Sequence, residues 1–143
     1  MKKRTIMIAG CGRFGARLAS QLSADGYYVV VIDLDKRAFR RLSERFCGRM
    51  LEGDATDTTL LHEACAEQAA YVVATTGSDN INCMIALIAK KIYHTEHVFA
   101  RLYDDKKECL LASCGIQVIY PELLFASEFE RLSHIQYQLA AEG

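Results

Sequence analysis

Three glycines near the N-terminus have the spacing of a phosphate-binding turn. Gly10, Gly12 and Gly15 form the pattern GxGxxG between an apolar run, TIMIA, and an amphipathic run that begins at Phe14. In such a turn the first glycine permits a tight bend, the second lets the backbone approach a diphosphate, and the third lets the following helix pack on the strand. The start of that helix offers unpaired N–H groups and the positive end of its dipole to the phosphates. The motif alone is a weak signal, so the surrounding sequence must support it.

An acidic residue follows the turn at the interval that a dinucleotide site requires. Asp33 ends the second predicted strand, 23 residues after Gly10, which is close to the interval of about 20 residues in the Rossmann fingerprint. Its carboxylate is expected to accept hydrogen bonds from the ribose hydroxyls beside adenine. The same charge repels a 2′-phosphate and so disfavours NADP. Lys36 and Arg37 weaken this exclusion, because either side chain can reach such a phosphate.

Two later loops follow predicted strands and are expected to complete the site. GDATD comes after the third strand and is placed beside the adenine, while ATTGSDN comes after the fourth and approaches the diphosphate and second ribose. Loops at the carboxyl ends of the strands are where a doubly wound sheet binds its ligand. A simpler alternative remains for both, since Asp and Thr before a helix often only cap it. The residues concerned are Asp54, Ala55, Thr75, Thr76 and Gly77.

The elements that must position these residues alternate along the chain. Short β-rich runs and stretches of helical period follow one another, which is typical of parallel strands joined by crossover helices. We therefore predict an α/β fold, a Rossmann-like doubly wound parallel six-stranded sheet. The predicted strands are 5–9, 28–33, 49–52, 71–75, 98–101 and 117–120. The apolar residues expected on buried helix faces are Phe14, Leu18 and Leu22, then Phe39, Leu42 and Phe46, then Ile81, Met84, Ile88 and Ile92.

The last stretch, residues 122–143, is predicted to be an amphipathic C-terminal crossover helix that follows Pro121. Its apolar stripe has two interpretations: the helix packs back on its own sheet, or part of the stripe contacts another protomer or a missing lobe. The stripe consists of Leu124, Phe125, Phe129 and Leu132. The sequence thus divides into a nucleotide-binding part, 1–121, and a crossover or dimerisation helix, 122–143.

Composition excludes several classes of function. The chain has 143 residues and a net charge of -1, which favours a single domain and gives no electrostatic reason to expect a nucleic acid partner. Its six cysteines form no CxxC pair, so neither a metal site nor a disulfide framework is expected. No apolar run is long enough to cross a membrane. We expect a cytoplasmic protein.

The motifs together resemble a known family. GCGRFG, VVVIDLDKRAFRRL, GDATD, ATTGSDN, FARLYDD and CGIQVIYPE stand in the order and approximate spacing of the N-lobe of RCK domains, also called the TrkA-N or KTN domain. The resemblance covers residues 4 to about 135. These domains are cytoplasmic regulators of Trk and Ktr potassium uptake systems, potassium channels and Kef-type antiporters.

The resemblance implies a ligand-gated regulator and not an enzyme. In such domains NAD or NADH, or alternatively AMP, ADP or ATP, lies across the glycine turn and biases the arrangement of paired lobes. It implies a homodimer or higher homo-oligomer, bound at the inner face of the membrane to a membrane-embedded potassium transporter or channel subunit. It also adds Arg101, which matches an arginine that approaches phosphates. The predicted cofactor-binding residues are Gly10, Cys11, Gly12, Arg13, Phe14, Gly15, Asp33, Leu34, Asp35, Asp54, Ala55, Thr75, Thr76, Gly77 and Arg101.

The alternative is the cofactor-binding domain of an NAD-dependent oxidoreductase. Hydride transfer needs a substrate held against the nicotinamide and usually a general acid or base. Tyr103 and Lys107 have the YxxxK spacing of short-chain dehydrogenases, but no serine stands at the matching place upstream. No other nucleophile and base pair is evident. We therefore predict no catalytic residues and no metal site.

Overall fold

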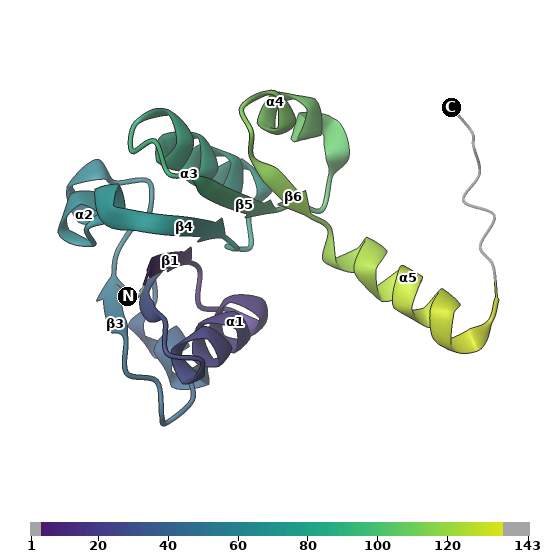
Figure 1. The fold of residues 1–143 in the computed structure, drawn as a ribbon, viewed down its shortest axis with the longest axis horizontal. Helices are drawn as coiled ribbons and strands as arrows, with labels where there is room; N and C mark the ends of the chain where they lie inside the picture. The colour runs from purple at the N-terminus through teal and green to yellow at the C-terminus, as the bar shows by residue number, and fades with distance from the viewer. Residues whose placement is uncertain (1–3, 136–143) are drawn as a thin grey trace.

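The fold is built on one parallel sheet of six strands (Figure 1). The computed structural model describes residues 4–135. The strands lie in the order β3-β2-β1-β4-β5-β6, and every pair is parallel. The strands are β1 (Thr5–Ala9), β2 (Tyr28–Asp33), β3 (Arg49–Glu52), β4 (Ala69–Ala74), β5 (His97–Arg101) and β6 (Gln117–Ile119). This order confirms the prediction of a Rossmann-like doubly wound sheet.

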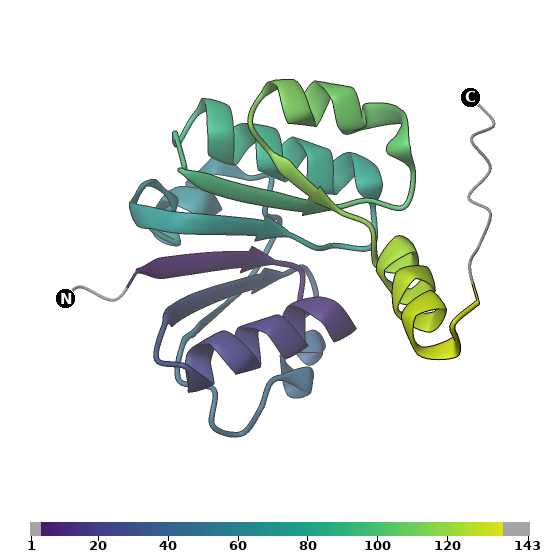
Figure 2. The ribbon, with the colours of Figure 1, turned by 45° about the vertical axis from the view of Figure 1, so that its right-hand side comes forward.

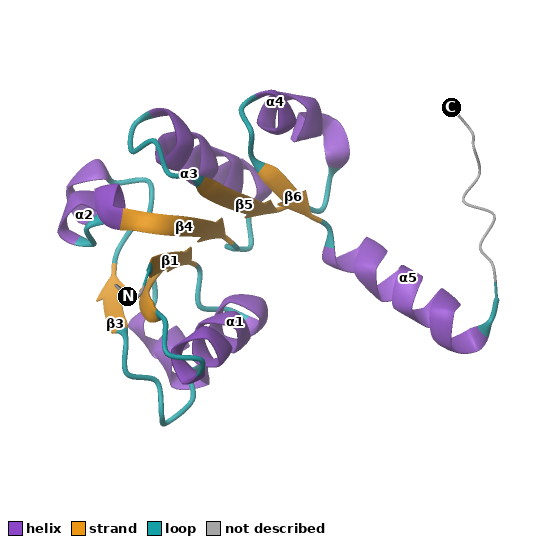
Figure 3. Cartoon of the chain, viewed as in Figure 1, coloured by secondary structure: helices purple, strands orange, loops and turns teal. Residues whose placement is uncertain are grey.

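Helices connect the strands (Figure 3). The α-helices are α1 (Arg13–Ala24), α2 (Thr58–Glu63), α3 (Asp79–Lys91), α4 (Glu108–Ser113) and α5 (Pro121–Ser133). Three short 3₁₀ helices are η1 (Lys36–Arg41), η2 (Ala66–Gln68) and η3 (Asp105–Lys107). Ser78 caps α3 as expected from its type, because its hydroxyl accepts a hydrogen bond from the Ile81 N–H.

Two apolar layers cover the two faces of the sheet. On one face, α2, α3 and α4 pack on strand residues such as Met7 and Val72. On the other face, α1 and η1 pack on Ile8 and Val31. Strand residues alternate between the two faces, so the central strands β1 and β2 are buried on both sides. Their continuous apolar runs are explained by this double burial.

The helix faces that meet the sheet differ from the predicted ones. In α1, small residues such as Gly15 and Ala19 are buried, whereas Phe14 is 52% exposed. In α3, Ile85 and Ala86 are among the buried residues. The predicted stripe of this helix is exposed at its start, Ile81 and Met84, and at its end, Ile92. The small residues of α1 let its axis approach the sheet closely, whereas α3 contacts the sheet through Ile85 together with smaller residues. The exposed members of the predicted stripes are Phe14, Leu18, Ile81, Met84 and Ile92.

The prediction of a second α-helix, around Phe39, Leu42 and Phe46, is wrong. The segment between β2 and β3 forms only the 3₁₀ helix η1, which ends at Arg41. Its apolar residues Phe39, Leu42 and Phe46 nevertheless pack, half-buried, on the α1 side of the core. The apolar pattern therefore indicated burial correctly, although it did not specify the backbone conformation.

Helix α5 projects away from the sheet instead of packing back on it (Figures 1 and 2). Pro121 begins the helix, a position that tolerates its missing N–H. None of its residues is buried, and Phe125 is 77% exposed. The predicted crossover segment extends to 143, but 136–143 lie outside the described residues. Within residues 4–135, no helix is long and apolar enough to span a lipid bilayer.

Candidate functional site

The glycine turn joins β1 to α1 at the centre of the sheet. Gly10 has φ +104°, and its N–H donates to the Ile32 carbonyl at 2.7 Å. A Cβ atom at Gly10 would lie 2.6 Å from the Thr75 carbonyl oxygen, so both the conformation and the space require glycine there. Strand β2 lies on one side of β1 and β4 on the other. The chain winds outward from β1 to β3 on one side and, after β3, crosses to β4 on the other side of β1. The turn thus lies at the topological switch point, which is where open α/β sheets bind ligands.

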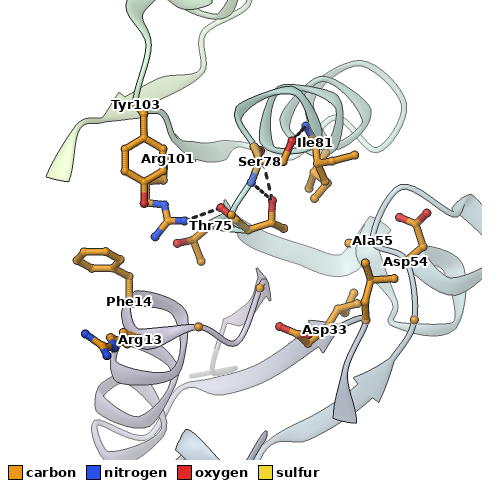
Figure 4. A pocket seen from close by; sticks show the side chains of 18 residues that line it. Arg13, Phe14, Asp33, Asp54, Ala55, Thr75, Ser78, Ile81, Arg101 and Tyr103 are labelled. Atoms are coloured by element: carbon orange, nitrogen blue, oxygen red, sulfur yellow. Dashed lines mark hydrogen bonds between the residues drawn. The ribbon is translucent and has the colours of Figure 1, made fainter. Parts of the chain in front are cut away.

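A cleft of about 600 Å³ opens over this turn (Figure 4). Its size and its mixed apolar and polar lining are those of a small-molecule site. Most of the predicted binding residues line it, although they come from five separate segments of the chain. These residues are Gly10, Gly12, Arg13, Phe14, Asp33, Leu34, Asp54, Ala55, Thr75, Thr76, Gly77 and Arg101.

Asp33 is held in place at the end of β2 by two backbone groups. The Cys11 N–H donates to Asp33 Oδ2 at 2.7 Å, and the Asp35 N–H donates to Asp33 Oδ1 at 2.8 Å. Each carboxylate oxygen has a second acceptor site. The carboxylate is thus oriented by the turn and still has capacity to accept hydroxyl groups from the cleft.

Three predicted residues do not line the cleft. Cys11 lies beneath the turn, fully buried, with its thiol directed to the Ala38 carbonyl. Burial, together with the charge of Asp33, raises the pKa of the Cys11 thiol to about 11, so it is protonated and unreactive near neutral pH. Gly15 faces the strand, where a Cβ would lie 1.9 Å from the Gly10 carbonyl oxygen. Both residues support the turn from below.

Asp35 is the third residue outside the cleft, because its carboxylate serves η1. It accepts from the Arg37 N–H at 2.9 Å and forms an ion pair with the Arg37 guanidinium at 3.0 Å. These contacts lower the pKa of Asp35. The Arg37 guanidinium thus lies on Asp35 and does not line the cleft.

The loop after β3 forms the wall opposite α1. The Asp54 carboxylate accepts from both the N–H and the hydroxyl of Thr56, at 2.8 and 2.7 Å, and these bonds lower its pKa. Asp57 caps α2 by accepting from the Thr59 N–H. Asp54 therefore stabilises its own turn and does not cap the helix, while Ala55 is buried at the cleft wall.

The far side of the cleft is organised around Arg101, the last residue of β5. Its Nη2 donates to the Thr76 carbonyl at 2.6 Å. The guanidinium carbon lies 5.1 Å from the centre of the Phe14 ring and 5.2 Å from that of Tyr103, so it stacks between two aromatic rings (Figure 4). A planar cation is thus fixed at the mouth of the cleft, close to the start of α1.

This arrangement can be compared with known protein families. The profile of the TrkA-N domain matches residues 6–121, which includes every element from the glycine turn to β6. The chain belongs to the TrkA-N domain family.

A curated relative of this TrkA-N domain is the Trk system potassium uptake protein TrkA of Streptomyces coelicolor. The two are 39% identical over 114 residues, a match that covers 80% of this chain and 51% of the relative. The chain thus spans about half the length of that protein.

Solved structures show the same fold. The TrkA-N domain of the inner membrane protein ybaL from Escherichia coli has a TM-score of 0.80 at 23% identity, over 92% of this chain and 97% of that one. The Kef CTD of Shewanella denitrificans, in AMP-bound form, has a TM-score of 0.72 at 24% identity, over 94% and 83% of the two chains. The GsuK channel bound to NAD has a TM-score of 0.68 at 21% identity, over 82% of this chain and 21% of that one.

Several residues of the TrkA-N cleft escaped the sequence analysis. Ile32 and Gly53 adjoin predicted site residues, Ser78 caps α3, and Ile81 and Ile85 lie on the first two turns of that helix. Tyr103 was considered only as half of a YxxxK pair. It lines the cleft, but Lys107 does not: its Nζ contacts Asn80 Oδ1 outside the cleft. The sequence did contain a signal for Tyr103: it lies two residues after Arg101, in the loop that follows a predicted strand, where ligand-binding residues are expected.

Proposed function

We propose that this TrkA-N domain binds NAD(H) or an adenine nucleotide and, through that ligand, regulates a membrane-embedded potassium transporter or channel. The observation that carries the proposal is the cleft at the reversal point of the sheet. It combines an exposed glycine turn, an oriented carboxylate at Asp33 and a fixed cation at Arg101.

The residues of the cleft fit such a ligand. No atom lies within 4 Å of the place where a Cβ of Gly12 would stand, so the backbone is open to a diphosphate at the start of α1. Asp33 is available to a ribose, and Ala55 and Leu34 offer apolar surface to a base. Among the proteins compared, one solved structure contains AMP and another contains NAD. Both ligands share the adenosine monophosphate half that this part of the cleft suits.

We further propose that the ligand is bound without being transformed. A hydride-transfer enzyme needs a proton donor or acceptor beside the nicotinamide. The Tyr103 and Lys107 pair is divided between the cleft and its outer surface, so it does not form a proton relay to a bound substrate. The name of the Streptomyces relative, a potassium uptake protein, supports a regulatory role in ion transport.

Regulation requires two arrangements with different affinity for the ligand. We propose that these are two packings of a homodimer formed through α5 at the cytoplasmic face of the membrane. Residues 1–121 then form the nucleotide-binding part and 122–143 the dimerisation helix. Exposed apolar side chains on α5, including Phe125 and Leu124, support this assignment. Ile119, on the edge strand β6 that precedes α5, is also exposed.

Calorimetric titration tests the proposal. Purified protein is titrated with NAD, NADH, NADP, AMP, ADP and ATP, and the series is repeated with Asp33→Ala. We expect micromolar binding of one or two ligands, at least tenfold weaker binding of NADP than of NAD, and a loss of tenfold or more in the variant, since a hydrogen bond to a charged group contributes about 1.5–3 kcal/mol. Asp57→Ala is the matched control, because it removes a capping aspartate that does not line the cleft. Absence of binding by all six ligands would refute the proposal.

A further inference from the structure

A buried asparagine lies directly behind the far side of the cleft. Asn82, on the first turn of α3, is 1% exposed and does not line the cleft itself. Polar side chains are costly to bury unless their hydrogen bonds are satisfied. The side chain of Asn82 makes four such bonds, all of them to residues that line the cleft.

The four bonds join two segments that are distant in sequence. Asn82 Oδ1 accepts from the N–H of Thr76 at 2.8 Å and from its hydroxyl at 2.6 Å. Asn82 Nδ2 donates to the Thr76 carbonyl at 3.0 Å and to the Arg101 carbonyl at 2.8 Å. One amide therefore fixes the backbone of the loop after β4 on both sides of Thr76 and ties it to the end of β5.

These bonds determine where the guanidinium of Arg101 stands. The Thr76 carbonyl receives both Asn82 Nδ2 and Arg101 Nη2, so the acceptor that orients the guanidinium is itself held by Asn82. Asp79, in the same helical turn, accepts from the Tyr103 N–H at 3.0 Å and so holds the second ring beside Arg101. The first turn of α3 thus positions both the cation and one of the rings that enclose it.

We infer that Asn82 is a positioning residue that sets the affinity for the second half of a dinucleotide. This inference rests on the proposed nucleotide-binding function. The adenosine monophosphate half meets the glycine turn and Asp33, whose hydrogen bonds go to Ile32, Cys11 and Asp35 and not to Asn82. The second phosphate and ribose extend toward Thr76 and Arg101, both of which Asn82 holds. Its loss therefore weakens a dinucleotide selectively and leaves a mononucleotide largely unaffected.

Comparison of NAD with AMP tests the inference. Asn82→Asp has the same shape and keeps the acceptor toward Thr76, but it loses both donors and sets an anionic oxygen against two carbonyl groups. We expect the dissociation constant of NAD to rise tenfold or more, while that of AMP stays within threefold. Asn82→Ser serves as a second variant, because its hydroxyl is neutral and too short to bridge the two segments. Thermal melting confirms that each variant is folded.

Ser23→Ala is the matched control. Ser23 is also buried, and its hydroxyl accepts from the Cys47 N–H at 3.2 Å, so it ties a helix to a loop far from the cleft. A general loss of stability would then appear in the control as well. A selective loss of NAD binding in the Asn82 variants supports the inference, and an equal loss for both ligands, or no loss, overturns it. Wild-type protein that binds AMP, ADP or ATP but not NAD overturns only the inference, whereas wild-type protein that binds none of the six ligands refutes the proposed function itself.

Discussion

The guanidinium of Arg101 and the ring of Phe14 stack 5.1 Å apart, although they belong to opposite halves of the sheet. Phe14 lies on α1, which follows β1, whereas Arg101 ends β5 on the other side of β4. The contact crosses the mouth of the cleft, with Tyr103 on the outer side of the cation.

Arg101→Ala is expected to weaken binding of ligands with two or more phosphates by tenfold or more. The guanidinium provides a charge-assisted contact, which contributes about 1.5–3 kcal/mol. Arg101→Lys retains the charge without the planar stack and should recover part of the affinity. Calorimetry with ADP or NAD measures the effect. Equal affinity in wild type and Arg101→Ala would show that the phosphates lie elsewhere.

The two glycines of the turn are expected to respond differently to alanine. Gly15→Ala places a Cβ 1.9 Å from the Gly10 carbonyl oxygen, and the overpacking should lower the free energy of unfolding by about 3 kcal/mol or more. Gly12 has an ordinary φ of −75° and open space around it. Gly12→Ala should therefore keep or slightly increase stability.

Gly12→Ala should nevertheless reduce nucleotide affinity at least tenfold, because the methyl group occupies the approach of the diphosphate. Chemical denaturation and calorimetry separate the two effects. A stable Gly15→Ala protein, or a Gly12→Ala protein with undiminished affinity, would contradict the assigned roles of these positions.

Phe125→Glu on α5 is expected to convert a dimer into a monomer. Phe125 is 77% exposed and therefore contributes little to the fold of its own chain, but a charge on the apolar stripe opposes burial against a second protomer. Truncation before Glu122 should have the same effect and should spare nucleotide binding. Sedimentation velocity measures the mass in solution.

Ser127→Glu provides the control for this experiment, because it adds the same charge to the same helix. Ser127 is exposed about half a turn from Phe125, on the side of α5 away from the apolar stripe. It should remain dimeric. A monomeric wild-type protein at tens of micromolar, or a Phe125→Glu protein of unchanged mass, would exclude α5 as the dimer surface.

The sequence by itself determined the strands, the glycine turn and the position of Asp33. Apolar runs of β-rich residues located all six strands to within two residues at each end. The turn and Asp33 could be found because their geometry is local: a backbone that needs glycine, and an acid at the end of the next strand. Both are encoded in short intervals along the chain.

Tertiary structure decided which side of each helix meets the sheet. Phe14 and Met84 have the spacing of a buried stripe, yet both are exposed, because other residues face the strands: small ones in α1, and Ile85 with smaller ones in α3. Apolar periodicity gives the position of a stripe on a helix. It does not state whether the stripe faces the core, a ligand or another protein.

Tertiary structure also decided the membership of the cleft. Asp35 is only two residues from Asp33, but its carboxylate pairs with Arg37 outside the cleft. Tyr103 lines the cleft, and Asn82 holds Arg101 from behind it, although the sequence pattern connected neither residue with the site. Asn82 meets Arg101 only because β4 and β5 are neighbours in the sheet, which brings the loop after one strand beside the end of the other. Contacts of this kind depend on strand order and on close packing between distant segments. Neither can be predicted from the local spacing of residues along the chain.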